Sequence, residues 1–192
     1  MKQVLAMADA RHKKSAQEGR PEWWNSDHWA TPPELVRALE AEFGPFDLDP
    51  CCLPDTAKAP RYYTEADNGL LRPWFGRVFL NPPYSKPSIW LEKAISETTT
   101  GGADLVVALL PVSSDTRWFH RLVIDKAEIR FIQGRVRFLG WERTPIPAPK
   151  APSLYAIYRR VMDRDGHCSS DADDLENAVR ASANESGERN GR

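Results

Sequence analysis

RVFLNPPYSK, residues 77–86, is the stretch that says most about the fold, and the neighbouring elements can be interpreted from it. Its apolar run at residues 78–80 is typical of the end of a buried strand. The run stops at Asn81, which two prolines follow, and proline suits neither the interior of a strand nor that of a helix. The sequence therefore predicts a core strand that ends in a rigid loop, residues 81–84.

A helix is predicted upstream of this strand, in the stretch that begins TPPEL. Thr31 is a suitable N-cap, Pro32 suits the first helical position, and Glu34 completes a capping box. The apolar residues that follow recur on one helical face, and Gly44 is a typical stop signal.

The remaining pattern alternates strands with helices. Residues 104–111 are apolar on both faces, as expected of a central strand that is covered on two sides. Other strands are expected at 46–49, 62–63 and 153–158, helices at 87–95 and 118–123, and a hairpin or tight bend at 128–140. This order predicts an α/β, three-layer sheet with an antiparallel C-terminal hairpin.

Composition limits the domain organisation. The chain has 192 residues and no apolar run as long as the ~20 residues of a membrane span. We expect a flexible segment at residues 1–22, one domain at 23–162, and a disordered acidic and polar tail at 163–192. Three Cys and four scattered His, without a Cys-x2-Cys pair, predict reduced thiols, no metal site and a cytoplasmic protein.

Asn81-Pro82-Pro83-Tyr84 suits chemistry on an exocyclic amino nitrogen. The lone pair of that nitrogen is delocalised into its ring, so two acceptors aimed at its hydrogens would stabilise the charge that develops during attack. The Asn81 side-chain oxygen and the Pro82 carbonyl are candidate acceptors, and Tyr84 is a candidate stacking surface for an extruded base. The alternative is a rigid strand-ending loop with a surface tyrosine.

The sequence resembles the phage-type DNA N6-adenine methyltransferases, which use S-adenosylmethionine. The resemblance covers about residues 24–158. Its matching pieces are Trp29–Leu35, Asp47–Cys52, Ala57-Lys58, Tyr62–Thr64, Asp67–Leu70, Trp74, Val78–Tyr84, Asp115-Thr116, Trp118–His120 and Glu128–Phe138. It implies a Rossmann-like class I methyltransferase fold with a mostly parallel sheet, abbreviated in the cofactor half, with DNA as the partner and a monomer as a compatible state.

The same resemblance implies roles for individual residues. Asn81, Pro82, Pro83 and Tyr84 would form the target-base pocket. The cofactor would be bound by Trp29, Thr31, Pro32, Asp49, Pro50 and Asp67. No Gly-x-Gly follows the first strand, where Cys51-Cys52 stands instead, and Glu65 is the candidate for the cofactor ribose.

Other substrates and roles stay open at this point. An N4-cytosine, RNA or protein-glutamine methyltransferase would meet the same poorly nucleophilic nitrogen, and a non-catalytic nucleic-acid-binding protein would use the same scaffold. Residues 117–143 carry an excess of basic side chains, which suits either a phosphate backbone or a solvated face. Arg117 and Arg135 are the candidate phosphate contacts, and His120 is interpreted as structural.

Overall fold

The computed structural model describes residues 24–144, 146–147 and 149–160. The predicted flexible segment 1–22 and the predicted tail 163–192 lie outside these residues. Within the described part of the chain, six strands form one sheet in the order β2-β1-β3-β4-β6-β5. The elements are η1 (Ser26–His28), α2 (Pro33–Phe43), β1 (Leu48–Asp49), β2 (Arg61–Tyr62), β3 (Phe75–Leu80), α3 (Pro87–Thr99), β4 (Gly102–Pro111), α4 (Arg117–Leu122), β5 (Glu128–Phe131), η2 (Trp141–Arg143) and β6 (Ser153–Arg159).

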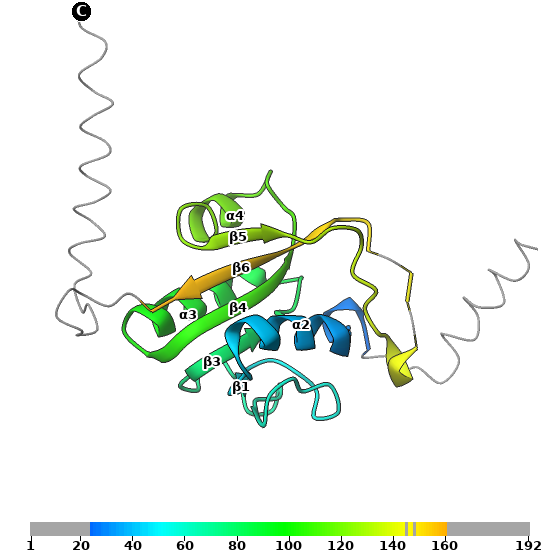
Figure 1. Ribbon diagram of the computed structural model, residues 1–192, viewed down its shortest axis with the longest axis horizontal. Helices are drawn as coiled ribbons and strands as arrows, with labels where there is room; N and C mark the ends of the chain where they lie inside the picture. The colour runs from blue at the N-terminus through cyan, green and yellow to red at the C-terminus, as the bar shows by residue number, and fades with distance from the viewer. Residues whose placement is uncertain (1–23, 145, 148, 161–192) are drawn as a thin grey trace, which may run out of the picture. The chain divides into compact units, whose positions relative to one another are not determined.

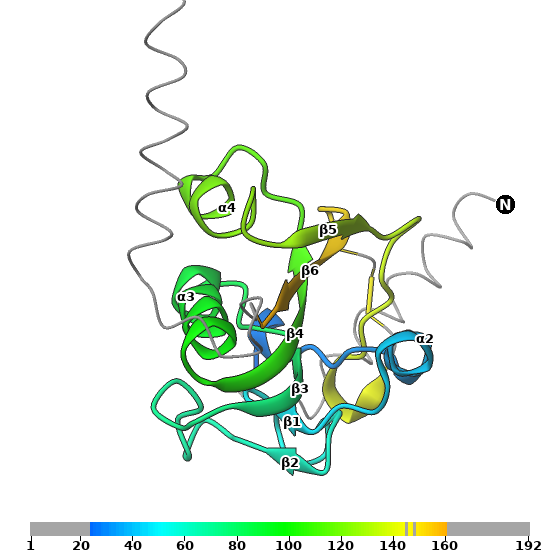
Figure 2. The same ribbon diagram turned by 60° about the vertical axis from the view of Figure 1, so that its left-hand side comes forward.

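The sheet is parallel from β2 to β4 and antiparallel at its other edge. β1 pairs in parallel with β2 and β3, and β3 pairs in parallel with β4. β6 runs antiparallel to both of its neighbours, β4 and β5. α2 covers one face and α3 and α4 cover the other (Figure 2). The predicted three-layer, Rossmann-like α/β fold is confirmed, with the carboxyl ends of β1, β3 and β4 at one edge.

β4 is the centre of the core (Figure 1). Its residues 106–110 are fully buried, as the apolar sequence predicts. Val106 and its alternate neighbours pack in the cluster that includes Leu91 of α3, whereas Val107 packs in the cluster that includes Leu39 of α2. This alternation follows from the twofold period of a strand. None of the helices in the described ranges has the length and apolar character that a membrane crossing needs.

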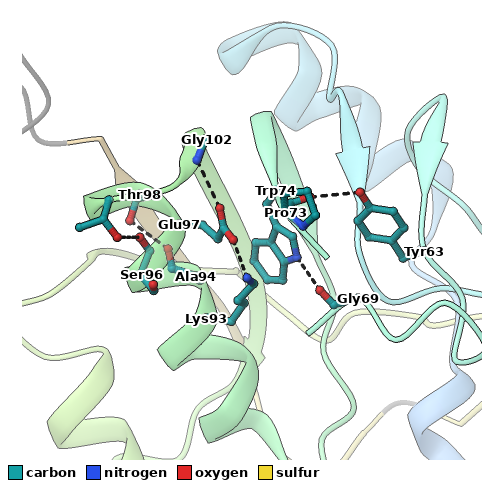
Figure 3. Close-up of polar contacts among 11 residues, drawn as sticks. Tyr63, Gly69, Pro73, Trp74, Lys93, Ala94, Ser96, Glu97, Thr98 and Gly102 are labelled. Carbon is teal, nitrogen blue, oxygen red and sulfur yellow. Dashed lines mark hydrogen bonds and ion pairs between the residues drawn. The ribbon is translucent and has the colours of Figure 1, made fainter. Parts of the chain in front are cut away.

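The half of the sheet next to β2 is abbreviated, as predicted. β1 and β2 contain two residues each, and the described segment between β1 and β3 contains no helix. Trp74 orders this segment because its buried Nε1 donates to the Gly69 carbonyl at 2.9 Å, and the Tyr63 hydroxyl donates to the Pro73 carbonyl at 3.1 Å (Figure 3). A Cβ at Gly69 would lie 2.0 Å from the Pro50 carbonyl oxygen, so this close approach requires glycine.

The predicted start of α2 is wrong by one residue. The helix begins at Pro33 with Pro32 as its N-cap, and no side chain caps it. Thr31 is too early to cap, and its side-chain hydroxyl is buried without a hydrogen-bond partner among the described residues. The helix does end at Gly44, whose φ of +82° suits glycine.

Of the hairpin or tight bend predicted at residues 128–140, the structure has the bend, at Gln133-Gly134, and the hairpin is wrong. β5 ends at Phe131 and pairs with β6 rather than with the residues that follow it. Gly134, with φ of +81°, turns the chain away from the sheet, and Leu139 then forms an isolated antiparallel bridge with Ala30. The apolar alternation at 136–138 looked like a second strand because Val136 and Phe138 are buried, but they pack against Leu109 instead of forming a ladder.

Candidate active site

A cavity of about 760 Å³ opens beyond the carboxyl ends of β1 and β3. In an open α/β sheet this edge is where ligands bind. The segment before α2, the loop after β1, the turn at residues 64–70 and the loop after β3 all contribute to its wall. Six residues predicted from the sequence line it together, namely Trp29, Thr31, Asp49, Pro50, Asn81 and Pro83.

The Asn81 side chain is held in one orientation. Its Nδ2 donates to the Trp29 carbonyl at 3.1 Å. A carbonyl accepts hydrogen bonds and never donates them, so this contact requires the amide nitrogen on that side and fixes the oxygen on the other. The Oδ1 is buried and has no hydrogen-bond partner among the described residues. The site therefore contains an oriented, buried acceptor that is not satisfied within this part of the chain.

Two further contacts hold the loop at residues 81–84. The Cys51 thiol donates to the Asn81 carbonyl at 3.3 Å, which joins the loop after β1 to the loop after β3. Asp27 of η1 accepts from the Ser85 backbone N–H at 3.1 Å, immediately after the loop. Sequence reasoning did not identify Cys51 or Asp27 as support for the loop, because both contacts join residues about 30 or more positions apart.

Pro82 and Tyr84 lie outside the large cavity. With Trp29, Asn81 and Phe138 they line a narrow recess next to it. The Tyr84 ring packs edge-on against Phe138, with centroids 6.2 Å apart and an interplanar angle of 83°. Burial raises the pKa of the Tyr84 hydroxyl, which has no hydrogen-bond partner among the described residues.

Phe138 is a site residue that sequence reasoning missed as such. It is fully buried, and its ring centroid lies 5.9 Å from that of Trp29 as well as 6.2 Å from that of Tyr84. The sequence signal was its place in the resemblance, within residues 128–138, but the expected hairpin assigned it to a strand. It joins the segment after β5 to the loop after β3.

Asp49 is buried at the end of β1, with 3% of its surface exposed. Burial raises the pKa of this carboxyl group to about 6, and hydrogen bonds from the Lys58 and Cys51 backbone N–H groups limit the rise. These donors lie 3.1 Å and 3.4 Å from its two oxygens. Asp49 therefore organises the loop at residues 51–58 and also contributes a carboxylate to the cavity wall.

Asp67 does not line the cavity. Its Oδ2 accepts from the Thr64 backbone N–H at 2.9 Å and from the Thr64 hydroxyl at 2.7 Å, and these hydrogen bonds lower its pKa. Its neighbours Glu65 and Asn68 are part of the wall. The structure therefore gives Asp67 a role in shaping the turn, while its predicted contact with the cofactor stays a prediction.

The cavity wall also carries Lys58 and Lys86, which sequence reasoning did not assign to the site. Burial lowers the pKa of Lys58, and the positive charge of Arg143 adds to this effect.

Two other residues from the sequence analysis lie away from the cavity wall. Pro32 is buried as the N-cap of α2 and does not line the cavity. The ring of His120 on α4 forms a hydrogen bond of 2.7 Å with the Ser114 carbonyl. Within the described ranges, no group of His, Cys, Asp and Glu side chains is arranged to hold a metal ion.

Known proteins resemble this chain over most of the described residues. Residues 22–178 match the family described as DNA N-6-adenine-methyltransferase (Dam). The DNA N-6-adenine-methyltransferase of Escherichia phage T1 is 36% identical over 110 residues, which are 56% of this chain and 45% of that protein. The protein of the same name from Haemophilus phage HP1 is 36% identical over 121 residues, 62% of this chain and 69% of that protein.

A solved structure also aligns with this chain, at a TM-score of 0.49 and 10% sequence identity. It is titled as an RNA methyltransferase, PH1948 from Pyrococcus horikoshii, and the alignment covers 80% of this chain and 100% of that one. The family match over residues 22–178 includes the loops that build the cavity as well as the sheet. The chain belongs to the DNA N-6-adenine-methyltransferase (Dam) family.

Proposed function

We propose that this protein transfers a methyl group from S-adenosylmethionine to the N6 amino group of adenine in DNA. The observation that carries the proposal is the buried Asn81 Oδ1, which is oriented by the Trp29 carbonyl at the edge of the cavity and lacks a partner among the described residues. A buried acceptor without a partner is costly in a folded protein, so it indicates a site for a ligand donor. Membership of the family supports adenine in DNA as the ligand.

The cavity suits the proposed cofactor. About 760 Å³ lies within the range of small-molecule sites. The buried Thr31 hydroxyl, which also lacks a partner among the described residues, lies on its wall just before α2. Asp49, which also lines the cavity, suits an amino or ribose hydroxyl group. S-adenosylmethionine would supply, when bound, an electrophilic methyl group attached to a positively charged sulfur.

The loop at residues 81–84 would act on the amino nitrogen. The Asn81 Oδ1 and the Pro82 carbonyl would each accept one of its hydrogens, and both would interact more strongly as positive charge develops on the nitrogen. The two prolines fix the backbone, so little reorganisation accompanies the reaction. After transfer the nitrogen releases one proton, which no described side chain needs to accept because solvent can take it.

The recess lined by Tyr84 and Phe138 has no free volume for even a water molecule in this structure, so it would have to open to receive the base. An enzyme that acts on a base within a duplex must extrude it, and aromatic rings provide a surface for the extruded base. The two rings contact each other edge-on in this structure. Entry of a base would therefore require Tyr84 to exchange its contact with Phe138 for a stacked contact with the base.

Product analysis tests the proposal. Purified protein is incubated with methyl-labelled S-adenosylmethionine and duplex DNA, single-stranded RNA or an unrelated protein, and the products are digested and separated. We expect label in N6-methyl-2′-deoxyadenosine from DNA. Label only in N4-methylcytosine, only in RNA or only in glutamine would contradict the proposal and identify the alternative substrate, and no transfer at all would indicate a non-catalytic role.

A further inference from the structure

The basic residues between positions 117 and 143 fall into two groups in the structure. Arg121 forms an ion pair with Glu92, and Arg130 forms ion pairs with Glu42 and Glu128. A second set is exposed and has no side-chain hydrogen bond or ion pair to any described residue; around the loops that follow β5 this set is Arg135, Arg137 and Arg143. The sequence alone could not separate the two groups, because the glutamate partners lie on α2, α3 and β5.

The backbone displays two of these arginines on one side. We call residues 134–139 the arginine strip. Along it, Val136 and Phe138 are 4% and 0% exposed, whereas Arg135 and Arg137 are exposed. In an extended chain successive side chains point to opposite sides, so the buried pair anchors the strip while the two arginines face away from the core. The arginines are therefore positioned by packing rather than free on a loose loop.

The arginine strip is fastened to the wall of the active site. Leu139 and Ala30 exchange two backbone hydrogen bonds, of 2.8 Å and 2.9 Å. Ala30 follows Trp29, whose carbonyl orients Asn81. Phe138 also packs against Tyr84. Figures 1 and 2 both show the segment after β5 descending on the α2 side of the sheet toward η2. The backbone of the arginine strip is therefore joined to the segment that orients Asn81, and its Phe138 lines the recess for the target base.

Arg135 and Arg137 are two exposed like charges that form no ion pair with a described residue. Such a pair contributes positive potential, which favours an anionic partner. The backbone of DNA presents phosphates on both sides of an extruded base, and these phosphates are anions of the kind that arginine binds well.

We propose that Arg135 and Arg137 of the arginine strip bind phosphates of duplex DNA that flank the target base. This inference rests on the proposed function, because it takes the recess lined by Tyr84 and Phe138 as the position of the base. It assigns a DNA-positioning role to a six-residue segment. Phosphate contacts position a protein on the duplex without reading its sequence.

The test measures DNA affinity as a function of salt. Each phosphate contact contributes about −0.9 to the slope of log K against log salt concentration. The double variant R135A/R137A is expected to reduce the magnitude of this slope by about 1.8, and to weaken binding about tenfold or more at low salt. The affinity for S-adenosylmethionine should be unchanged, because neither arginine lines the cavity.

Two further variants make the comparison specific. Lys126→Ala removes another exposed cation, which precedes β5. The first residue of β5, Glu128, pairs with Ile157 and lies toward the end of the sheet away from the cavity. It should leave the slope unchanged. R135K/R137K keeps both charges, and it should restore most of the affinity because a phosphate accepts a point charge, whereas a base edge read in a bidentate manner requires arginine.

The outcomes separate this inference from the proposed function. An unchanged slope for R135A/R137A would overturn the inference. An equal loss of DNA affinity in Lys126→Ala would do the same, and so would failure of R135K/R137K to restore the affinity. Tighter binding to duplex RNA than to duplex DNA would also contradict it. Binding that depends on the arginine strip without methyl transfer by the wild-type protein would support the inference and contradict the proposed function. Methyl transfer by the wild-type protein together with unchanged DNA binding by R135A/R137A would support the proposed function and contradict the inference.

Discussion

Replacing Asn81 by Ala removes both halves of the proposed catalytic contact. The Oδ1 would no longer accept from the target amino group, and the Nδ2 would no longer donate to the Trp29 carbonyl at 3.1 Å. Removal of one preorganised hydrogen-bonding group in an active site typically costs about 10²- to 10³-fold in kcat. Loss of the hydrogen bond to a partly buried carbonyl typically costs about 1–3 kcal/mol of stability. We expect both losses in Asn81→Ala.

Tyr158→Phe is the matched control, because it removes a buried hydrogen bond of the same kind elsewhere. The Tyr158 hydroxyl donates to the Leu122 carbonyl at 2.8 Å and lies outside both the cavity and the recess. This variant should lose about 1–3 kcal/mol of stability as well. Its kcat should stay within about twofold of the wild-type value, since no group near the reacting nitrogen changes.

The assay is single-turnover methyl transfer to duplex DNA at saturating S-adenosylmethionine, well below the unfolding temperature of each variant. Calorimetry measures cofactor affinity in parallel, and urea unfolding measures stability. The reasoning would be refuted by an Asn81→Ala rate within tenfold of wild type. It would also be refuted by an equal loss of rate in Tyr158→Phe, since both losses would then follow from stability alone.

Three further variants probe the cofactor side of the cavity. Thr31→Val should weaken S-adenosylmethionine binding about tenfold. Its stability should be unchanged or raised, because the variant removes a buried hydroxyl that has no partner among the described residues. The control Thr98→Val removes a hydroxyl that donates to the Ala94 carbonyl, so it should lower stability instead. Asp49 has a folded pKa of about 6 against an ordinary value of 3.8, so the folded state binds more protons between these values. As the pH falls from 7.5 to 4, the wild-type protein should therefore gain about 2.4 kcal/mol of stability relative to Asp49→Asn. Urea unfolding of both proteins at the two pH values should show this shift, and a constant difference would contradict it. Gly69→Ala should abolish cofactor binding measured by calorimetry, because its Cβ would meet the Pro50 carbonyl; unchanged binding would show that the wall can move.

The elements of the fold follow from local patterns in the sequence. The apolar run of β4, the stop at Asn81 after β3 and the stop at Gly44 after α2 each depend on neighbouring residues, and each lies where the sequence predicts it. The start of α2 was misplaced because Thr31 satisfies the capping pattern equally well, and only the structure shows that its hydroxyl is buried in the cavity wall instead.

The site was only partly predictable, because its supporting contacts join distant residues. Six predicted residues meet around the cavity, and all six belong to motifs that end a strand or begin a helix. The contacts of Asp27 with Ser85 and of Phe138 with Tyr84 have no local signal. Phe138 was misassigned for a physical reason, since alternating burial has the same period in a paired strand and in an extended segment that packs by side chains alone.

The most direct test of the central claim is to observe the new bond. Duplex DNA labelled with ¹⁵N at the adenine N6 position is incubated with the protein and with S-adenosylmethionine labelled with ¹³C in its methyl group, and the DNA is then examined by NMR. We predict a methyl carbon signal that is split by a one-bond coupling to the labelled nitrogen. A methyl signal in the DNA without that coupling would show that another atom receives the methyl group and would contradict the account.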